Sequence, residues 1–386
     1  MHKLMAGGTI LEHELSDLRL LVERQAGILL DCPNSALAAH VAEYLEIQEL
    51  GSVTAVIDRL RSADQDPACL PHFLSGVVNT DTGFFRHPGA MNALTRQVLP
   101  QLFARKSADN PATLRMWSAG CSTGEETYSI AMAACAALAG NSSGNSVGNA
   151  GGTCAGSAGG NNFTNPATPS YGNGSPNGSS GGKNTAGRNG GISEAFSSAP
   201  GTVSTSPAGT PQPLKEFSIH IVGSDLLPCS IEVAERGLYP QSALAGLPPA
   251  TIRACFSKIG SPNGNGSANL PNPSSPAPQN GSANGSHLLV KPRLRSLVTF
   301  NTMNLTKPVY IGRFDCIFCM DVLPHLSRVQ RTSLLERLHL YLEPGGYLFL
   351  SQTEKLSAPN LNFRSETFDG YTFHRKPLAA SAAYGR

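Results

Sequence analysis

The stretch Leu114–Ile130, LRMWSAGCSTGEETYSI, decides the fold of this chain. It opens with a short apolar run that is typical of a buried strand. The small residues from Ala119 to Gly124 follow, and their backbone can turn sharply and approach a ligand closely. Ser122 and Thr123 each precede a glutamate by three residues, which predicts a capping box and a helix start. This order predicts the first unit of a cofactor-binding α/β sheet, with the ligand at the carboxyl end of the strand.

The two glutamates that open this helix, Glu125 and Glu126, bear on the identity of the ligand. A dinucleotide-binding turn favours Gly-x-Gly-x-x-Gly and places pyrophosphate at the helix N-terminus, whereas here the glycines stand at Gly120 and Gly124. Carboxylates at that position repel a phosphate. We therefore expect a cationic or hydroxyl-rich ligand, a description that S-adenosylmethionine fits. The alternative is a structural turn in which the glutamates only complement the helix dipole.

Composition restricts the class of protein further. The chain has 386 residues and a formal net charge of +2, which gives no indication of a nucleic-acid partner. Its 9 cysteines are scattered, which argues against a disulfide framework and favours a reducing compartment. Cys316 and Cys319 form a CxxC without a second pair, so we interpret them as buried strand residues and expect no metal. Because neither a signal peptide nor a bilayer-length apolar run is evident, we expect a cytoplasmic protein.

The N-terminal part of the chain predicts a small helical domain over residues 11–75, because apolar residues recur there at helical spacing. Residues 76–89 follow as a linker, and Phe84 and Phe85 are natural anchors for docking it on a larger domain. Arg86 comes next, and its guanidinium fork suits a carboxylate. The alternative is a surface arginine beside two core aromatic residues.

Two tracts, 140–213 and 260–287, consist mostly of Gly, Asn, Ser, Ala and Pro. So few large apolar side chains cannot offset the entropy of ordering, so we predict that both tracts are disordered insertions. Without the first tract, the interval from Gly124 to Asp225 comes close to the roughly 20 residues expected between a glycine loop and the acidic residue that binds ribose hydroxyls. The tracts therefore interrupt a single α/β domain, residues 90–378.

The remainder of this domain predicts further elements of a parallel sheet. We expect strands at Phe217–Asp225, Leu297–Phe300, Phe314–Met320 and Tyr347–Ser351, helices at Cys229–Arg236 and Ser327–Leu342, and a C-terminal hairpin over 363–375. Residues 238–259 and 287–295 are expected to form a small lobe. Asp225 lies at the carboxyl end of its strand, and Asp321 and His325 follow another, where such sheets place their chemistry.

Six motifs taken together resemble those of the CheR-type chemotaxis protein-glutamate O-methyltransferases. They are TDTGFFR at 80–86, WSAGCSTGEETYSI at 117–130, GSDLLPCSIEVAERGLY at 223–239, NL at 304–305, FDCIFCMDVLPHL at 314–326 and LEPGGYLFLSQTE at 342–354. The FFRHP at 84–88 is similar to the branch linked to type IV pilus signalling. The resemblance implies an α/β fold: a Rossmann-like S-adenosylmethionine-dependent methyltransferase sheet with a small all-α N-terminal domain and an inserted small β-lobe.

The resemblance also implies roles for individual residues. Those expected to bind the cofactor, S-adenosyl-L-methionine, are Thr80, Thr82, Arg86, Glu126, Asp225, Asn304, Leu305, Met320 and Asp321. Arg86 and His325 are expected to be catalytic, with Arg86 near the transferred methyl group and the substrate carboxylate. The implied activity is methylation of glutamate side chains on a methyl-accepting chemoreceptor-like protein. We expect a monomer without a nucleic-acid partner or stable membrane insertion.

The chain departs from the pattern of this family at several positions. Met320-Asp321 and His325-Leu326 stand where the family usually has Arg-Asn and Tyr-Phe. An aromatic hydroxyl is therefore missing, and a negative charge is added near an acidic substrate. The helix expected over 37–50 carries three glutamates and no Arg or Lys, so it would not attract an acidic receptor helix. Two alternatives stay open: a cofactor-binding regulator with weak or no catalysis, and a methyltransferase for a small molecule.

Overall fold

The computed structural model describes residues 10–62, 66, 68–78, 80–107, 109, 112–143, 217–259, 287–356 and 360–378. Both predicted insertions lie outside these residues except at their edges. Residues 140–143 continue helix α7 (Glu125–Ser143), and His287 opens strand β5 (His287–Val290), so the boundaries predicted for the insertions were wrong at these two points. No helix in the described ranges is long and apolar enough to cross a bilayer.

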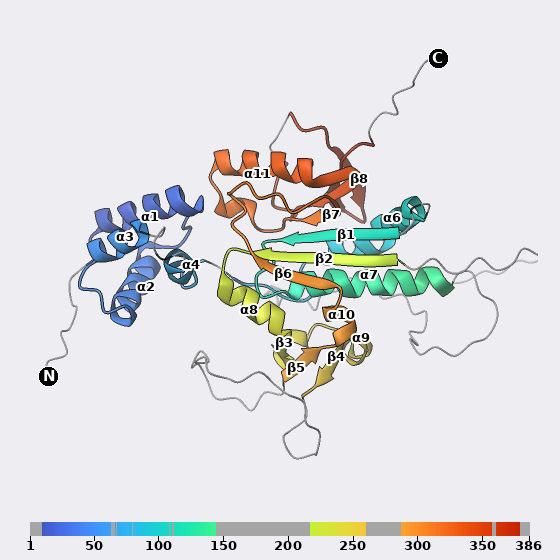
Figure 1. The fold of residues 1–386 in the computed structure, drawn as a ribbon, viewed down its shortest axis with the longest axis horizontal. Helices are drawn as coiled ribbons and strands as arrows, with labels where there is room; N and C mark the ends of the chain where they lie inside the picture. Colours follow the sequence, from blue (N-terminus) through green and yellow to red (C-terminus); the bar gives the residue numbers. More distant parts are fainter. Residues whose placement is uncertain are drawn as a thin grey trace, which may run out of the picture. The chain divides into compact units, whose positions relative to one another are not determined.

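A seven-stranded sheet forms the centre of the fold, with the strand order β6-β2-β1-β7-β8-β10-β9 (Figure 1). Strands β6, β2, β1, β7 and β8 run parallel, and β10 and β9 add an antiparallel edge. The strands span Ala112–Ala119 (β1), Phe217–Asp225 (β2), Val298–Thr302 (β6), Phe314–Phe318 (β7), Leu342–Phe349 (β8), Arg364–Phe368 (β9) and Tyr371–Arg375 (β10). The predicted Rossmann-like α/β class is confirmed.

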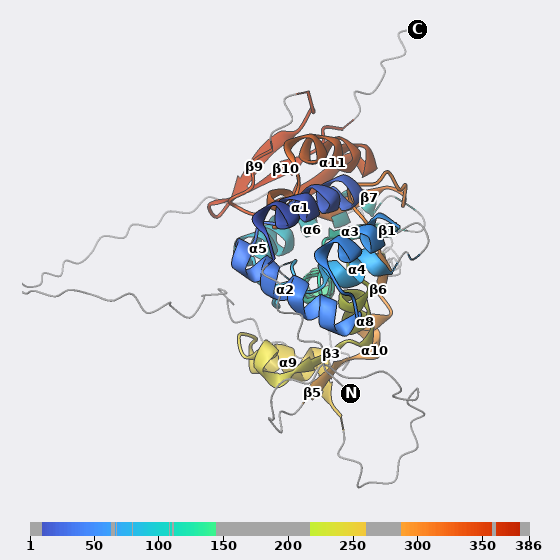
Figure 2. The same cartoon turned by 90° about the vertical axis from the view of Figure 1, so that its left-hand side faces the viewer.

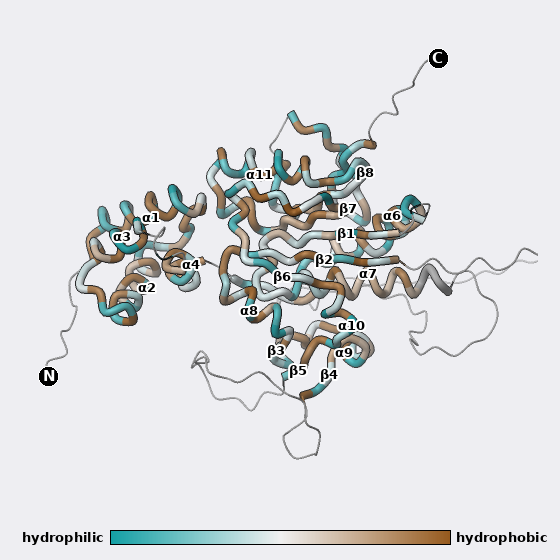
Figure 3. The backbone as a smooth tube through the Cα atoms, in the orientation of Figure 1, coloured by the Kyte–Doolittle hydropathy of each residue, from teal (hydrophilic) through white to brown (hydrophobic). Residues whose placement is uncertain are grey.

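Alternate residues of the central strands enter two different cores, as the period of a strand requires. Met116 of β1 packs in one core with helices α5 (Pro88–Ala93), α6 (Leu99–Lys106) and α7. Trp117 packs in the other with α11 (Arg328–Tyr341) and the N-terminal helices. A π-helical turn, η1 (Leu94–Val98), joins α5 to α6. Figure 3 shows apolar colouring along much of α7, whose residues Ile130, Ala131 and Ala134 are buried.

Strand β8 begins earlier than the sequence predicts. The predicted helix ends at Leu342 and the predicted strand starts at Tyr347, so Pro344, Gly345 and Gly346 fall between them in the prediction, but they lie within β8. The glycines are held in the sheet because Gly345 N–H donates to Lys376 O, and Lys376 N–H donates to Gly346 O, each at 2.9 Å. Gly345 has a φ of 76°, so the strand is irregular at this point.

The N-terminal group of helices comprises α1 (Glu12–Ala26), α2 (Asn34–Ile47), α3 (Val53–Arg61) and α4 (Cys69–Leu74), which Figure 2 brings to the front. Its apolar side chains share a core with α11 and β7. The segment after α1 also bonds directly to the larger domain, because Leu29 N–H donates to His325 O at 2.8 Å and Ile28 forms a β-bridge with Leu326. This segment therefore reaches the carboxyl edge of the sheet.

The small lobe predicted from residues 238–259 and 287–295 is confirmed as a three-stranded antiparallel sheet of order β3-β5-β4. Its elements are β3 (Leu238–Pro240), the 3-10 turn η2 (Gln241–Leu244), α9 (Pro249–Cys255), β4 (Phe256–Lys258), β5 and α10 (Pro292–Arg295). It follows α8 (Pro228–Arg236), which ends as predicted at Gly237, with a φ of 61°.

Gly124, in the turn between β1 and α7, lies close to Ala234 of α8, and a substitution at Gly124 tests this contact. Its φ is 95°, and an added Cβ would lie 2.7 Å from Ala234 Cβ and 3.1 Å from Ala234 Cα. We expect Gly124→Ala to lower the free energy of unfolding by about 2 kcal/mol or more in urea denaturation. The matched control is Gly246→Ala, where nothing lies within 4 Å of the added Cβ and the effect should stay within about 0.5 kcal/mol. Equal effects of the two changes would contradict this description of the turn.

Candidate functional site

A pocket lies where the carboxyl ends of β1, β2 and β7 meet. The structure brings every predicted site residue to its wall: Thr80, Thr82, Arg86, Glu126, Asp225, Asn304, Leu305, Met320, Asp321 and His325. They come from the linker, the start of α7, the ends of β2 and β7, and the segment after β6. Residues far apart in the sequence therefore share one cavity, at the sheet edge where parallel α/β folds bind ligands.

The backbone around the pocket is strained. Five non-glycine residues in the described ranges have a positive φ, and three of them, Phe85 (53°), Ser122 (48°) and Asp321 (59°), line this pocket. Gly120 beside them has a φ of 84°, and a Cβ there would lie 2.4 Å from Val322 Cγ2. Such conformations persist only where the surroundings hold them, and they concentrate at functional sites.

The turn after β1 is tied to β2 through Asp225. Its carboxylate accepts hydrogen bonds from Ser122 N–H at 2.8 Å and from Leu227 N–H at 3.0 Å. Burial raises the pKa of Asp225, and these backbone N–H groups oppose the rise by favouring the ionised form. An ionised carboxylate has about four lone-pair sites, so acceptor capacity remains for a ligand.

The linker contacts this turn, helix α7 and the small lobe through polar and aromatic side chains. The Ser122 hydroxyl donates to Thr80 O at 2.9 Å, and Phe85 N–H donates to the Ser129 hydroxyl at 2.9 Å. Phe84 packs edge-on against Tyr239 and Phe256, with ring centroids 5.0 and 5.4 Å away. The linker residues Thr80 to Arg86 are therefore held against the mouth of the pocket.

The two glutamates at the start of α7 have separate partners. The helix begins where predicted. The predicted capping box is wrong, because the side chains of Glu125 and Glu126 accept hydrogen bonds from other hydroxyl groups. Glu125 accepts a hydrogen bond from the Thr123 hydroxyl at 2.7 Å, and Glu126 accepts one from the Ser118 hydroxyl at 2.7 Å. Burial, helped by the nearby charges of Asp321 and Glu354, raises the pKa of Glu126 to about 7, although the Ser118 hydrogen bond lowers it.

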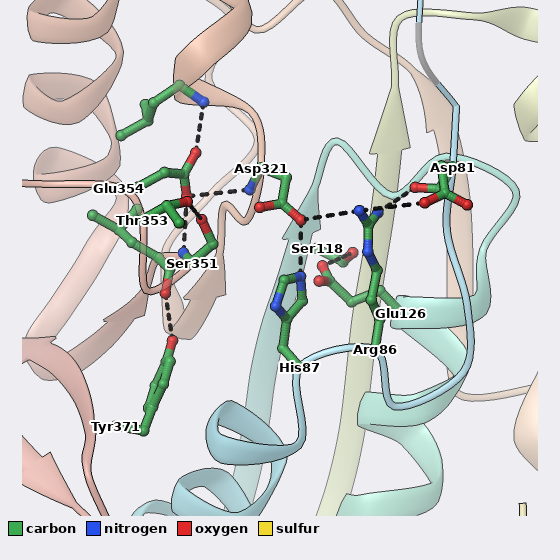
Figure 4. Close-up of polar contacts among 12 residues, drawn as sticks. Asp81, Arg86, His87, Ser118, Glu126, Asp321, Ser351, Thr353, Glu354 and Tyr371 are labelled. Atoms are coloured by element: carbon green, nitrogen blue, oxygen red, sulfur yellow. Dashed lines mark hydrogen bonds and ion pairs between the residues drawn. The ribbon is translucent and has the colours of Figure 1, made fainter. Parts of the chain in front are cut away.

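A cluster of charged side chains crosses the pocket mouth (Figure 4). Asp321 Oδ2 lies 3.0 Å from His87 Nε2 and 3.7 Å from an Arg86 guanidinium nitrogen. The same nitrogen lies 3.6 Å from the carboxylate of Asp81, and Arg86 also donates to Asp81 O. Sequence reasoning missed His87 and Asp81 as members of this cluster. The only sequence signal was their position, next to Arg86 in one case and beside Thr80 in the other.

Other predicted residues contribute to the wall in different ways. The Asn304 amide donates to Ala26 O at 3.2 Å, and its Oδ1 accepts from Thr306 N–H at 2.9 Å, so its polar atoms serve the chain itself. His325 lines the pocket, but the histidine in contact with Asp321 is His87. Met320 is buried, as are Cys316 and Cys319, so the CxxC cysteines are buried as predicted. Cys316 lies in β7, whereas Cys319 follows the end of that strand at Phe318.

The sequence of this chain is similar to those of known proteins. The family model described as CheR methyltransferase, SAM binding domain, matches residues 80–145 and 277–371. Chemotaxis protein methyltransferase 1 of Pseudomonas aeruginosa is 23% identical over 342 residues, which cover 88% of this chain and 89% of that protein. Chemotaxis protein methyltransferase Cher2 of Pseudomonas putida is 24% identical over 348 residues, covering 89% and 90%. Among solved structures, the SAM-bound amino pentose methyltransferase CalS10 of Micromonospora echinaspora aligns with 75% of this chain and 64% of its own, at a TM-score of 0.25 and 10% identity.

The fold, the pocket and the sequence matches define an S-adenosylmethionine-dependent methyltransferase. Within that class, residues 80–145 and 277–371 match the SAM-binding domain of CheR methyltransferases, and the chain is similar along most of its length to chemotaxis protein methyltransferases. The groups present suit the cofactor, because Glu126, Asp225 and Asp321 offer carboxyls to a ligand that carries a sulfonium, an amine and ribose hydroxyls. Among the described residues that line the pocket, Arg86 is the one permanently charged cation, and Asp321 and Asp81 flank it.

The raised pKa of Glu126 predicts a pH-dependent stability. Between its ordinary pKa of 4.5 and the folded value of about 7, the folded state keeps a proton that the unfolded state releases, so stability falls as pH rises. The amide of Glu126→Gln does not titrate. In ligand-free protein, the free energy of unfolding of this variant relative to wild type should therefore rise by up to about 3 kcal/mol from pH 5 to pH 8.

Urea denaturation at intervals of pH measures this difference. The control is Glu232→Gln, a change at an exposed carboxyl on α8, for which the difference from wild type should stay level. A level difference for Glu126→Gln as well would contradict the assignment of a raised pKa.

Proposed function

We propose that this chain transfers methyl groups from S-adenosylmethionine to glutamate side chains of a chemoreceptor-like signalling protein, and that it does so in the cytoplasm. The observation that carries the proposal is Arg86, whose side chain is 41% exposed at the mouth of a pocket lined by carboxyls. An arginine fork there suits an acceptor carboxylate. The names of the two Pseudomonas relatives, both chemotaxis protein methyltransferases, support the receptor as the substrate.

Within this proposal, the pocket residues divide into two groups. Asp225 accepts from the ribose hydroxyls and Glu126 faces the cationic amino acid part of the cofactor. Asn304 and Leu305 form the adenine side, and Thr80, Thr82, Met320 and Asp321 complete the wall. Arg86 and His325 lie on the acceptor side. All of these residues line the same cavity, which is what the division requires.

The chemistry asks little of the protein beyond positioning. The cofactor supplies an electrophilic methyl group on a sulfonium. A glutamate with an ordinary pKa near 4.3 is already a carboxylate at pH 7, so no strong base is needed. The chain must hold the acceptor oxygen in line and exclude water. Arg86 can do so while paired, because a guanidinium has five donors and Asp81 and Asp321 do not occupy all of them.

A second function has an observation in its favour. Both carboxylates that flank Arg86 lie within 4.0 Å of its guanidinium and compete with an incoming acceptor carboxylate. If Arg86 stays paired with these carboxylates and does not bind an acceptor carboxylate, the protein binds the cofactor and acts as a regulator with little catalysis. The two functions differ in one measurable respect, which is turnover.

Replacement of Arg86 tests the proposed function. Wild-type protein with tritiated S-adenosylmethionine and purified cytoplasmic fragments of methyl-accepting chemoreceptors should form a base-labile methyl ester. Arg86→Ala should reduce the rate about 100-fold, because an acceptor carboxylate loses its charge-assisted hydrogen bonds. Arg61→Ala is the matched control, since Arg61 is an exposed arginine on α3 paired only with Asp58 among the contacts of its side chain in the described structure.

The outcomes separate the functions. Transfer that survives in Arg86→Ala contradicts the role of this residue. Cofactor binding without any transfer by wild type favours the regulator, and transfer without a receptor fragment favours a small-molecule acceptor.

A further inference from the structure

The turn that follows β7 carries Asp321 to the pocket in an unfavourable backbone conformation. Asp321 has a φ of 59°, in the left-handed region that non-glycine residues rarely adopt. In this conformation its side chain lies against Arg86 and His87, and the surrounding structure must hold the turn in place. The linker hydrogen bonds described above join Phe85 to Ser129 and Ser122 to Thr80.

The carboxylate of Glu354 accepts hydrogen bonds from the backbone of this turn (Figure 4). Glu354 Oε2 accepts from Asp321 N–H at 3.2 Å and from Ser351 N–H at 2.8 Å, while Oε1 accepts from Leu323 N–H at 2.8 Å. The bonds from Asp321 and Leu323 join the turn after β7 to the segment after β8, and the bond from Ser351 lies within that segment. Hydrogen bonds from backbone amides to a carboxylate are among the stronger ones in proteins.

Contacts within the segment after β8, and one contact from β10, hold the backbone next to Glu354. The Ser351 hydroxyl lies 3.2 Å from the Thr353 hydroxyl, and the Tyr371 hydroxyl donates to Leu350 O from strand β10. Burial raises the pKa of Glu354, and the three amides oppose that rise by favouring the charged form. The carboxylate is therefore held by three backbone N–H groups.

We propose that Glu354 is a positioning residue for methyl transfer, which fixes the turn after β7 so that the carboxylate of Asp321 faces Arg86 and His87. This inference rests on the proposed function. Glu354 does not belong to the described residues that line the pocket, and its bonds go to backbone amides. It therefore acts through Asp321, which orients the Arg86 and His87 side chains at the acceptor side.

A double-mutant cycle separates positioning from a general loss of stability. Glu354→Gln replaces one carboxylate oxygen by an NH₂ group that cannot accept, and Asp321→Asn removes the charge that orients Arg86. Each change should lower the rate of methyl transfer about 10-fold, and the double variant should also be about 10-fold slower. A merely structural role of Glu354 would give independent effects, about 100-fold together. Glu336→Gln, an exposed carboxyl on α11, is the control and should leave the rate unchanged.

Hydrogen exchange provides a readout that needs no activity. In Glu354→Gln, the peptide covering residues 319–326 should exchange faster than in wild type, because its amides lose their acceptor, whereas Glu336→Gln should leave it unchanged. If Glu354→Gln does not fold, Glu354→Asp, which keeps the charge but shortens the side chain, takes its place in both experiments.

Failure of the proposed function and failure of the positioning role of Glu354 give different results. Absence of transfer by wild type overturns the proposed function, whatever the exchange shows. Unchanged exchange in 319–326, or independent effects in the cycle, overturns the positioning role of Glu354.

Discussion

The hydrogen bond from Ser122 N–H to the carboxylate of Asp225 joins the ends of β1 and β2, and the pocket depends on it. Two neighbouring backbone bonds reinforce the junction, because Gly120 and Cys121 N–H both donate to Ser224 O, at 2.8 and 2.9 Å. Together they bend the chain at the strand end so that α7 starts beside the cavity. The same turn then receives the linker through the Ser122 hydroxyl. One strand junction therefore sets the positions of α7, the linker and the acidic group at the end of β2.

The charges that line this pocket distinguish it from a phosphate-binding turn. Carboxyls approach it from α7, from β2 and from the turn after β7, whereas a phosphate-binding turn would present bare backbone amides at the helix N-terminus. Burial holds the pKa of Glu126 near 7, so its charge depends on what occupies the cavity. A cationic nucleoside favours the ionised form, and an anionic one opposes it. On the proposed acceptor side, the guanidinium of Arg86 lies between the carboxylates of Asp81 and Asp321.

Sequence patterns predicted the sheet and much of the site for identifiable reasons. Apolar runs such as Phe314–Met320 predict strands buried on both faces, and the carboxyl ends of parallel strands meet at one edge, so Asp225 and Asp321 could be expected together. The contacts of His87 and Glu354 could not be predicted. They depend on a left-handed turn at Asp321 and on a segment that follows another strand, and neither leaves a periodic signal. The early start of β8 has the same origin, because Gly345 and Gly346 pair with a distant part of the chain.

Calorimetry with S-adenosylhomocysteine tests the central claim, that carboxyls at this sheet edge hold the cofactor, most directly. Wild-type protein should bind with a micromolar dissociation constant, and Asp225→Ala should weaken binding at least about 10-fold, since its loss removes both the acceptor for the ribose hydroxyls and the tie to the Ser122 turn. Glu232→Ala, on the exposed side of α8, should bind like wild type. Equal affinities of Asp225→Ala and wild type, or no binding by wild type at millimolar ligand, would contradict the account.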